Sequence, residues 1–98
     1  MIFEISFSPR SKQDLAAILD YLDAEWGASV SEKFLDKIDG LLDLISESPK
    51  IFSVVNKEKK IHKCVVNRNI SLFYRIKNKE IELITFFHNK QHPSKQNL

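Results

Sequence analysis

Five basic side chains in the C-terminal half have the chemistry to act on a phosphate group: Lys63, Arg75, His88, Lys90 and His92. Imidazole groups exchange protons near neutral pH, and ammonium and guanidinium groups stabilise negative charge on oxygen. Each also has an ordinary structural interpretation. His88 fits a strand-end histidine followed by a solvated tail, and Lys63 and Arg75 fit a bound anion or solubilising charge equally well.

Other chemistry has weaker support in the sequence. Cys64 is the single cysteine and lies within an apolar run, which predicts a buried, unreactive thiol and no internal disulfide. His62, His88 and His92 have no ligand spacing and no accompanying carboxylate. We therefore expect neither a metal site nor a cofactor.

The charge is divided between the two halves of the chain. Residues 1–49 hold 4 Lys/Arg and 10 Asp/Glu, a net charge of −6, and residues 50–98 hold 11 and 3, a net charge of +8. This division favours an anionic partner for the C-terminal half, and the lysines of residues 50–60 would add to electrostatic steering.

Composition predicts one folded domain over residues 1–98, with 43% apolar and 29% charged residues. No apolar run reaches the roughly 20 residues of a membrane span, and Glu4 interrupts the start of any signal peptide. We expect a cytoplasmic protein that does not associate with a membrane.

The N-terminal half predicts a strand and two helices. Residues 2–7 alternate with period two, and Ser8-Pro9 suits a helix entry. An apolar stripe from Leu15 to Trp26 predicts the first helix and places Trp26 in the core. Gly27 should end that helix, and Ser29 with Glu32 forms a capping-box pattern for a second helix that ends at Ser48-Pro49. The short link predicts a helical hairpin.

The C-terminal half predicts a basic loop over residues 50–60 and strands over residues 61–66, 70–77 and 81–88. In the last strand, Ile81, Leu83, Thr85 and Phe87 should share one face, opposite Glu82, Ile84, Phe86 and His88. The expected fold is α+β with the order β-α-α-β-β-β. The helical hairpin covers one face of an antiparallel meander, Arg75 and Lys77 lie on the other, and residues 89–98 form a loose tail.

This order of elements resembles the RelE/ParE superfamily of bacterial toxins from type II toxin–antitoxin systems, over about residues 2–93. The residues that carry the resemblance are Asp14-Leu15, Ile18 and Tyr21-Leu22 in the first helix, Phe34, Ile38, Leu42 and Pro49 in and after the second, Leu72, Tyr74, Arg75 and Ile76 in a strand, and the closing Phe86-Phe87-His88-Asn89-Lys90-Gln91-His92-Pro93. Their order and spacing, rather than any single element, make the resemblance specific.

The two branches of the superfamily have different activities, so the resemblance implies one of two functions. RelE-like toxins are ribosome-dependent mRNA endoribonucleases, and ParE-like toxins are associated with poisoning of DNA gyrase. The RelE-like arginine three residues before the strand tyrosine corresponds to Ser71 here, and no tyrosine follows Tyr74. The closing histidine and proline are similar to ParE-type endings, with Lys90 and Gln91 in place of arginines. The resemblance therefore favours the ParE-like branch, and an enzymatic activity is not expected.

The resemblance implies a growth-inhibiting toxin, with gyrase as its target, that is neutralised by a cognate antitoxin. Operator DNA would be bound only indirectly, through the antitoxin. The alternatives are a RelE-like ribonuclease with a rearranged site on Lys63, Arg75, His88 and Lys90, and a member that only binds its partner. Residues expected to contact the target or nucleic acid are Lys63, Arg75, Lys77, His88, Lys90 and His92. Exposed parts of Phe3, Phe34, Leu35 and Leu41 are expected to receive the antitoxin, whose acidic or amphipathic tail would suit the basic half.

Overall fold

The computed structural model describes residues 2–88, so Lys90, His92 and the predicted tail lie outside the described residues. The elements in chain order are β1 (Glu4–Phe7), α1 (Pro9–Trp26), α2 (Ala28–Glu47), β2 (Val54–Asn56), β3 (Ile61–Val65), β4 (Ile70–Lys77) and β5 (Glu80–His88). The α+β class is confirmed, with one strand more than the sequence predicts. None of the helices in this part of the chain is long and apolar enough to cross a membrane.

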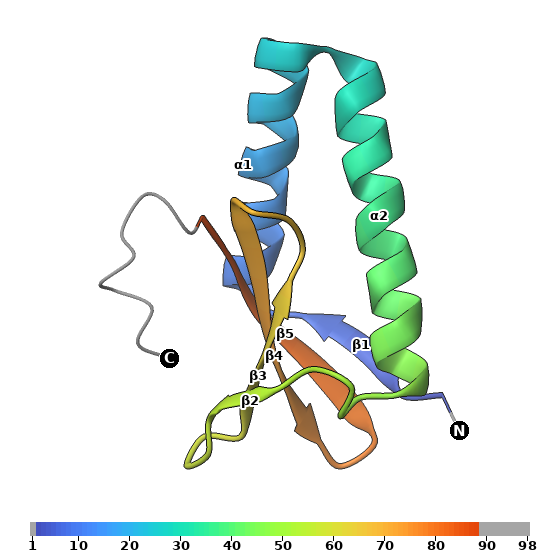
Figure 1. Cartoon of the computed structure of the whole chain (residues 1–98), viewed down its shortest axis with the longest axis vertical. Helices are drawn as coiled ribbons and strands as arrows, with labels where there is room; N and C mark the ends of the chain where they lie inside the picture. The colour runs from blue at the N-terminus through green and yellow to red at the C-terminus, as the bar shows by residue number, and fades with distance from the viewer. Residues whose placement is uncertain (1, 89–98) are drawn as a thin grey trace.

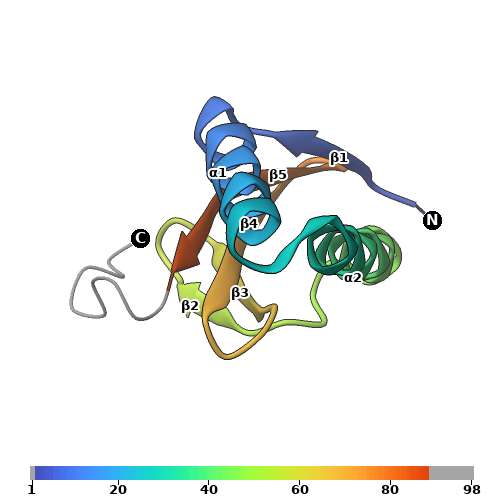
Figure 2. The same cartoon turned by 90° about the horizontal axis from the view of Figure 1, so that it is seen from above.

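A five-stranded sheet in the order β1-β5-β4-β3-β2 forms the base of the fold. Strands β3, β4 and β5 form the predicted antiparallel meander, and β1 joins β5 in parallel. The helices α1 and α2 run side by side in opposite directions, and α1 lies across β5 (Figures 1 and 2). The helical hairpin therefore covers one face of the sheet, as the sequence predicts.

The helix boundaries confirm two of the three local signals. Ser8 is the N-cap of α1, and its side chain accepts a hydrogen bond from the Ser11 N–H at 3.0 Å. Gly27 has φ = 93°, a conformation that glycine adopts readily, and it is the only residue between α1 and α2. The predicted capping box at Ser29 is wrong, because α2 already begins at Ala28 and has no side-chain cap.

The basic loop predicted over residues 50–60 contains β2, which is a correction. This strand is only Val54–Asn56, and its pairing with β3 is irregular between Val54 and Asn56. A strand of three residues with a register shift leaves no period to detect in the sequence.

A register shift in β5 overturns half of its predicted faces. Phe73 pairs with Thr85 but Tyr74 pairs with Leu83, so Ile84 is an extra residue in β5. Beyond this bulge the alternation is reversed. Phe86 therefore pairs with Leu72 and joins the core beside the helices, whereas the sequence pattern places it on the opposite face from Leu83.

The core lies between the hairpin and the sheet and includes Phe34, Ile38 and Ile45 of α2 with Leu72 and Tyr74 of β4. Trp26 is 66% exposed, so its predicted core position is wrong. It is the last residue of α1, at the hairpin tip, which projects beyond the sheet (Figure 1).

Candidate functional site

The sheet face away from the helices carries three of the four predicted basic residues that the structure describes. Lys63 on β3 pairs with Phe73 on β4, and its Nζ lies 5.8 Å from the centroid of the Phe73 ring, which is a cation–π arrangement. The guanidinium Nε of Arg75 donates to the Glu82 carboxylate at 2.7 Å. Arg75 therefore has an intramolecular counter-ion, which weakens its attraction for an external anion.

Lys77 lies at the end of β4, opposite Glu80 in the β4–β5 register. Both residues are exposed. Lys63, Arg75 and Lys77 thus line one sheet face, and two of the three lie opposite a carboxylate.

His88 lies apart from these residues, at the other end of the sheet. It pairs with Ile70 at the end of β5 and lines a cavity of about 500 Å³ between α1, α2 and the sheet. The Nδ1 atom of His88 and the Oδ1 atom of Asn69, both buried, have no hydrogen-bond partner among the residues described. The structure therefore does not assemble Lys63, Arg75 and His88 into one basic site.

The remaining cavity wall combines apolar side chains with the charged Arg10 and Asp14. Ile18, Leu22 and Phe34 line it from the helices, and Phe86 lines it from β5. The cavity combines an apolar surface with two unsatisfied polar atoms, which is the usual composition of a ligand or side-chain pocket.

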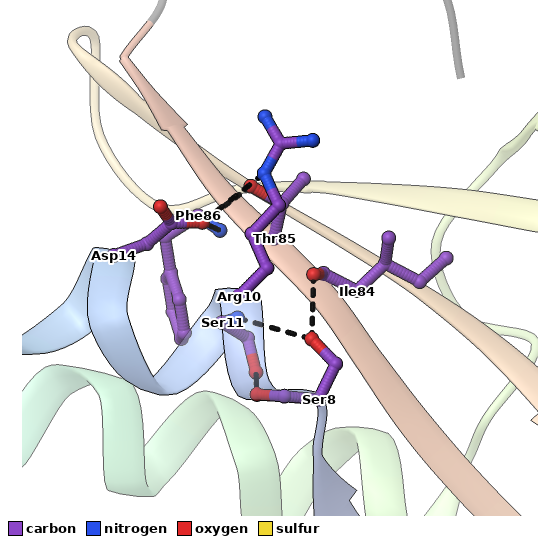
Figure 3. A network of polar contacts seen from close by, with 7 residues as sticks. All are labelled: Ser8, Arg10, Ser11, Asp14, Ile84, Thr85 and Phe86. Carbon is purple, nitrogen blue, oxygen red and sulfur yellow. Dashed lines mark hydrogen bonds and ion pairs between the residues drawn. The ribbon is translucent and has the colours of Figure 1, made fainter.

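A polar network joins the first turns of α1 to β5 beside this cavity (Figure 3). The Ser8 hydroxyl donates to the Ile84 carbonyl at 2.8 Å, and the Ser11 hydroxyl donates to the Ser8 carbonyl at 2.9 Å. The Asp14 carboxylate accepts hydrogen bonds from the Thr85 hydroxyl and, at 3.1 Å, from the Phe86 N–H. These bonds fix α1 against the part of β5 that β1 does not reach.

Arg10 extends this network towards solvent. Its Nε lies 3.9 Å from the Asp14 carboxylate, and its side chain is 62% exposed. Sequence reasoning did not single out Arg10, Asp14 or Thr85 as site residues. The i,i+4 spacing of Arg10 and Asp14 is a signal in the sequence, but the contact with β5 spans 71 residues and has none.

The strand tyrosine and the cysteine are structural. The Tyr74 hydroxyl donates to the Pro49 carbonyl at 2.7 Å, and its ring stacks on that of His62 with centroids 5.0 Å apart. Burial raises the pKa of Tyr74 to about 12 and that of Cys64 to about 11. Neither group ionises near neutral pH, and the Cys64 thiol is buried as predicted.

The residues predicted to receive an antitoxin differ widely in exposure. Phe34 is only 9% exposed, and Phe3 and Leu41 pack partly buried against the core. Leu35 is 38% exposed and is the most accessible of the four. No cluster of three or more metal-binding side chains occurs within residues 2–88.

Comparison with known proteins shows which family the sequence matches. The family described as the ParE toxin of the type II toxin–antitoxin system parDE matches residues 5–93. No curated protein matches the sequence.

Solved structures share the fold. The chromosomal ParDE system of P. aeruginosa includes a chain that is 17% identical, with a TM-score of 0.75 over 89% of this chain and 96% of that one. The YoeB dimer of Staphylococcus aureus is 17% identical, with a TM-score of 0.63 over 90% and 98% of the two chains. The E. coli DinJ–YafQ toxin–antitoxin complex gives 12% identity and a TM-score of 0.62 over 98% and 99%. Because the family match spans nearly the whole folded region, the chain belongs to the ParE toxin family of type II toxin–antitoxin systems.

Proposed function

We propose that this toxin arrests growth by acting on DNA gyrase in the cytoplasm and that a cognate antitoxin neutralises it. Membership of the ParE family supports the proposal. The observation that carries it is the replacement of the RelE-like basic site. Ser71 is fully buried at the position of the expected arginine, and the Arg75 guanidinium is paired with Glu82.

Cleavage of RNA needs a general base, a general acid and cations that meet at one phosphate. Among the described residues, the Tyr74 hydroxyl is bound to the Pro49 carbonyl. His88 of β5 pairs with Ile70, at the opposite end of the β4–β5 pair from Lys77. We therefore favour the gyrase target over a ribonuclease activity built on Lys63, Arg75, His88 and Lys90.

The target would be contacted through the basic sheet face of Lys63, Arg75 and Lys77, and His88 would make a separate contact at the other end of the sheet. Lys90 and His92 belong to the same proposal by sequence alone. The antitoxin would dock on Phe3, Phe34, Leu35 and Leu41, of which Leu35 is the most accessible. Burial of exposed apolar area is the main source of affinity in such an interface.

The test is induced expression of the toxin without its antitoxin, with DNA and protein synthesis labelled separately. We expect DNA synthesis to stop first, and purified toxin to trap cleaved DNA in a gyrase reaction. Co-expression of the antitoxin should restore growth. An early arrest of translation, with cleaved mRNA on ribosomes, would instead establish the ribonuclease.

A further inference from the structure

The turn between β2 and β3 carries a group of lysines whose placement no part of the proposed function uses. Lys57 and Lys60 come from this turn, and Lys50 comes from the turn after α2. All three line one cavity of about 670 Å³. We call these three residues, with the cavity between them, the lysine pocket.

The lysine turn is held in a defined conformation. The Asn56 side-chain oxygen accepts a hydrogen bond from the Lys59 N–H, three residues further on, at 2.9 Å, and this bond closes the turn. Lys60 has φ = 58°, the left-handed conformation that ends a tight turn. These two features fix the backbone of the turn, from which Lys57 and Lys60 both line the pocket.

The floor of the pocket is anchored to the sheet. His62 Nδ1 donates to the Phe52 carbonyl at 2.7 Å, and the neighbouring Tyr74 hydroxyl donates to the Pro49 carbonyl at 2.7 Å. These two bonds fix the segment that carries Lys50 and the half-buried Phe52 ring. The pocket is therefore preorganised, which lowers the entropic cost of binding.

Basic and uncharged residues line the pocket, and Glu58, the one carboxylate of the lysine turn, lies outside the lining. Of the residues that line it, none is acidic. Neither of the two ion pairs found within residues 2–88 involves Lys50, Lys57 or Lys60. Three ammonium groups around one cavity repel each other, and a bound anion relieves this repulsion.

The apolar part of the pocket indicates an anion that carries apolar groups beside its negative charge. Phe52, Val54 and Ile76 provide an apolar wall beside the lysines. A second cavity of about 700 Å³ shares Lys50 and Ile76 and continues past Pro49 and Ile51. Lys50 thus stands between two hollows with apolar walls, an arrangement suited to a phosphate flanked by two bases.

From this arrangement we infer that the lysine pocket binds a short single-stranded nucleic acid, with phosphates on the lysines and bases on the apolar walls. An acidic peptide strand fits less well, because it would add to the sheet edge at β2, which has only three residues and an irregular register. This inference goes beyond the proposed function, since the lysine pocket shares no residue with the proposed antitoxin surface or with the basic sheet face, and only the second cavity reaches Phe3.

The experiment measures fluorescence anisotropy of a labelled oligothymidine of about six nucleotides, titrated with the purified full chain at several salt concentrations. The test variant carries Lys57→Gln and Lys60→Gln. The matched control carries Lys59→Gln and Lys33→Gln, which remove the same charge from an exposed residue of the same turn and one of α2, both outside the pocket.

We expect the test variant to bind about tenfold more weakly and its log–log salt slope to fall in magnitude by about 1.4, which is two lost phosphate contacts at about 0.7 each. The control should lose less than about threefold. Equal losses of affinity in both variants would show that binding depends on the total charge of the protein and not on the pocket, and would overturn the inference.

Competition identifies the occupant. A glutamate-rich peptide that displaces the oligonucleotide better than unlabelled oligonucleotide does would assign the pocket to an acidic protein segment and overturn the inference. Displacement by thymidine monophosphate at an equal phosphate concentration would assign the pocket to free nucleotides. That result would overturn the inference that it binds a single-stranded nucleic acid. Because binding is measured on the isolated toxin, failure of the gyrase proposal leaves this result unaffected.

Discussion

At the residue scale, Asp14 closes the free edge of β5. β1 pairs with β5 only as far as Leu83, so the backbone beyond that point needs other partners. The Asp14 carboxylate supplies them by accepting from the Thr85 hydroxyl and the Phe86 N–H. An unpaired buried donor costs about 1–3 kcal/mol, so Asp14 decides whether the Phe86 N–H is satisfied, while the Ser8 hydroxyl bonds the Ile84 carbonyl.

Replacement of Asp14 by Ala should therefore destabilise the protein by about 1–3 kcal/mol, because it leaves the Phe86 N–H and the Thr85 hydroxyl without an acceptor. Urea denaturation followed by circular dichroism measures this difference. Thr85→Val serves as the partner in a double-mutant cycle, and the two effects should be less than additive. Full additivity would contradict a direct contact.

The burial of Cys64 predicts that the folded state loses stability at alkaline pH. Burial raises the pKa of its thiol to about 11 from 9.0, so the folded state keeps a proton that the unfolded state releases. The free energy of unfolding should therefore fall as pH rises above about 9, by at most about 1.4 kcal/mol per unit for one proton. Tyr74, with its pKa raised to about 12 from 10.0, adds to the fall above about pH 10.

The measurement is urea denaturation between about pH 8 and 10 for the natural chain and for Cys64→Ala. Between pH 9 and 10 the natural chain should lose stability more steeply than the variant, whatever their difference at neutral pH. Parallel pH profiles over this interval would show that the thiol does not cause the alkaline loss.

At the element scale, the helical hairpin depends on a single residue between its helices. Gly27 ends α1, where its N–H donates to the carbonyls of Leu22 and Asp23 at 3.1 Å, and it precedes the first residue of α2. Its φ of 93° is costly for any residue with a Cβ. Close by, the Ser31 hydroxyl of α2 donates to the Asp23 carboxylate of α1 and joins the two helices.

The two glycines of the chain should therefore respond to alanine in opposite directions. Gly27→Ala should destabilise the fold by about 1 kcal/mol or more, because of its positive φ. Gly40→Ala should stabilise it by about 0.5–1 kcal/mol, since Gly40 lies within α2 and an added Cβ meets nothing within 4 Å. Thermal denaturation measures both, at about 4–8 °C per kcal/mol. Changes of the same sign would contradict this account.

At the scale of the whole molecule, the acidic half of the sequence forms β1 and the hairpin, and the basic half forms the rest of the sheet and its turns. Apart from Glu4 of β1, the acidic residues of the N-terminal half lie in the hairpin layer, and the basic half forms four of the five strands of the sheet layer (Figure 2). The proposed antitoxin surface and the proposed target surface are likewise on different elements, which makes the two activities separable by substitution.

Leu35→Asp should abolish neutralisation by the antitoxin and leave growth arrest intact, because it places a charge within an apolar interface. Leu44→Asp is the matched control, since Leu44 is also 38% exposed on α2 but lies outside the predicted surface. We expect affinity for the purified antitoxin to fall at least tenfold for the first variant and little for the second. Equal losses of affinity in the two variants would show that Leu35 is not a specific part of the antitoxin surface.

The sequence by itself determined the α+β class, the helical hairpin and the meander, because each depends on local periodicity and on local signals such as Pro9, which restricts the backbone, and Gly27, which permits a positive φ. The predicted burial of Cys64 also follows from its apolar strand. These features depend on residues that are close in the chain, so pattern alone reveals them.

Only the tertiary structure decided which side chains meet. The bulge at Ile84 moved Phe86 into the core, Arg75 acquired Glu82 as an internal counter-ion, and His88 came to line a separate cavity. These outcomes depend on strand register and on contacts between distant segments. No local period encodes either one, because a single extra residue reverses every face that follows it.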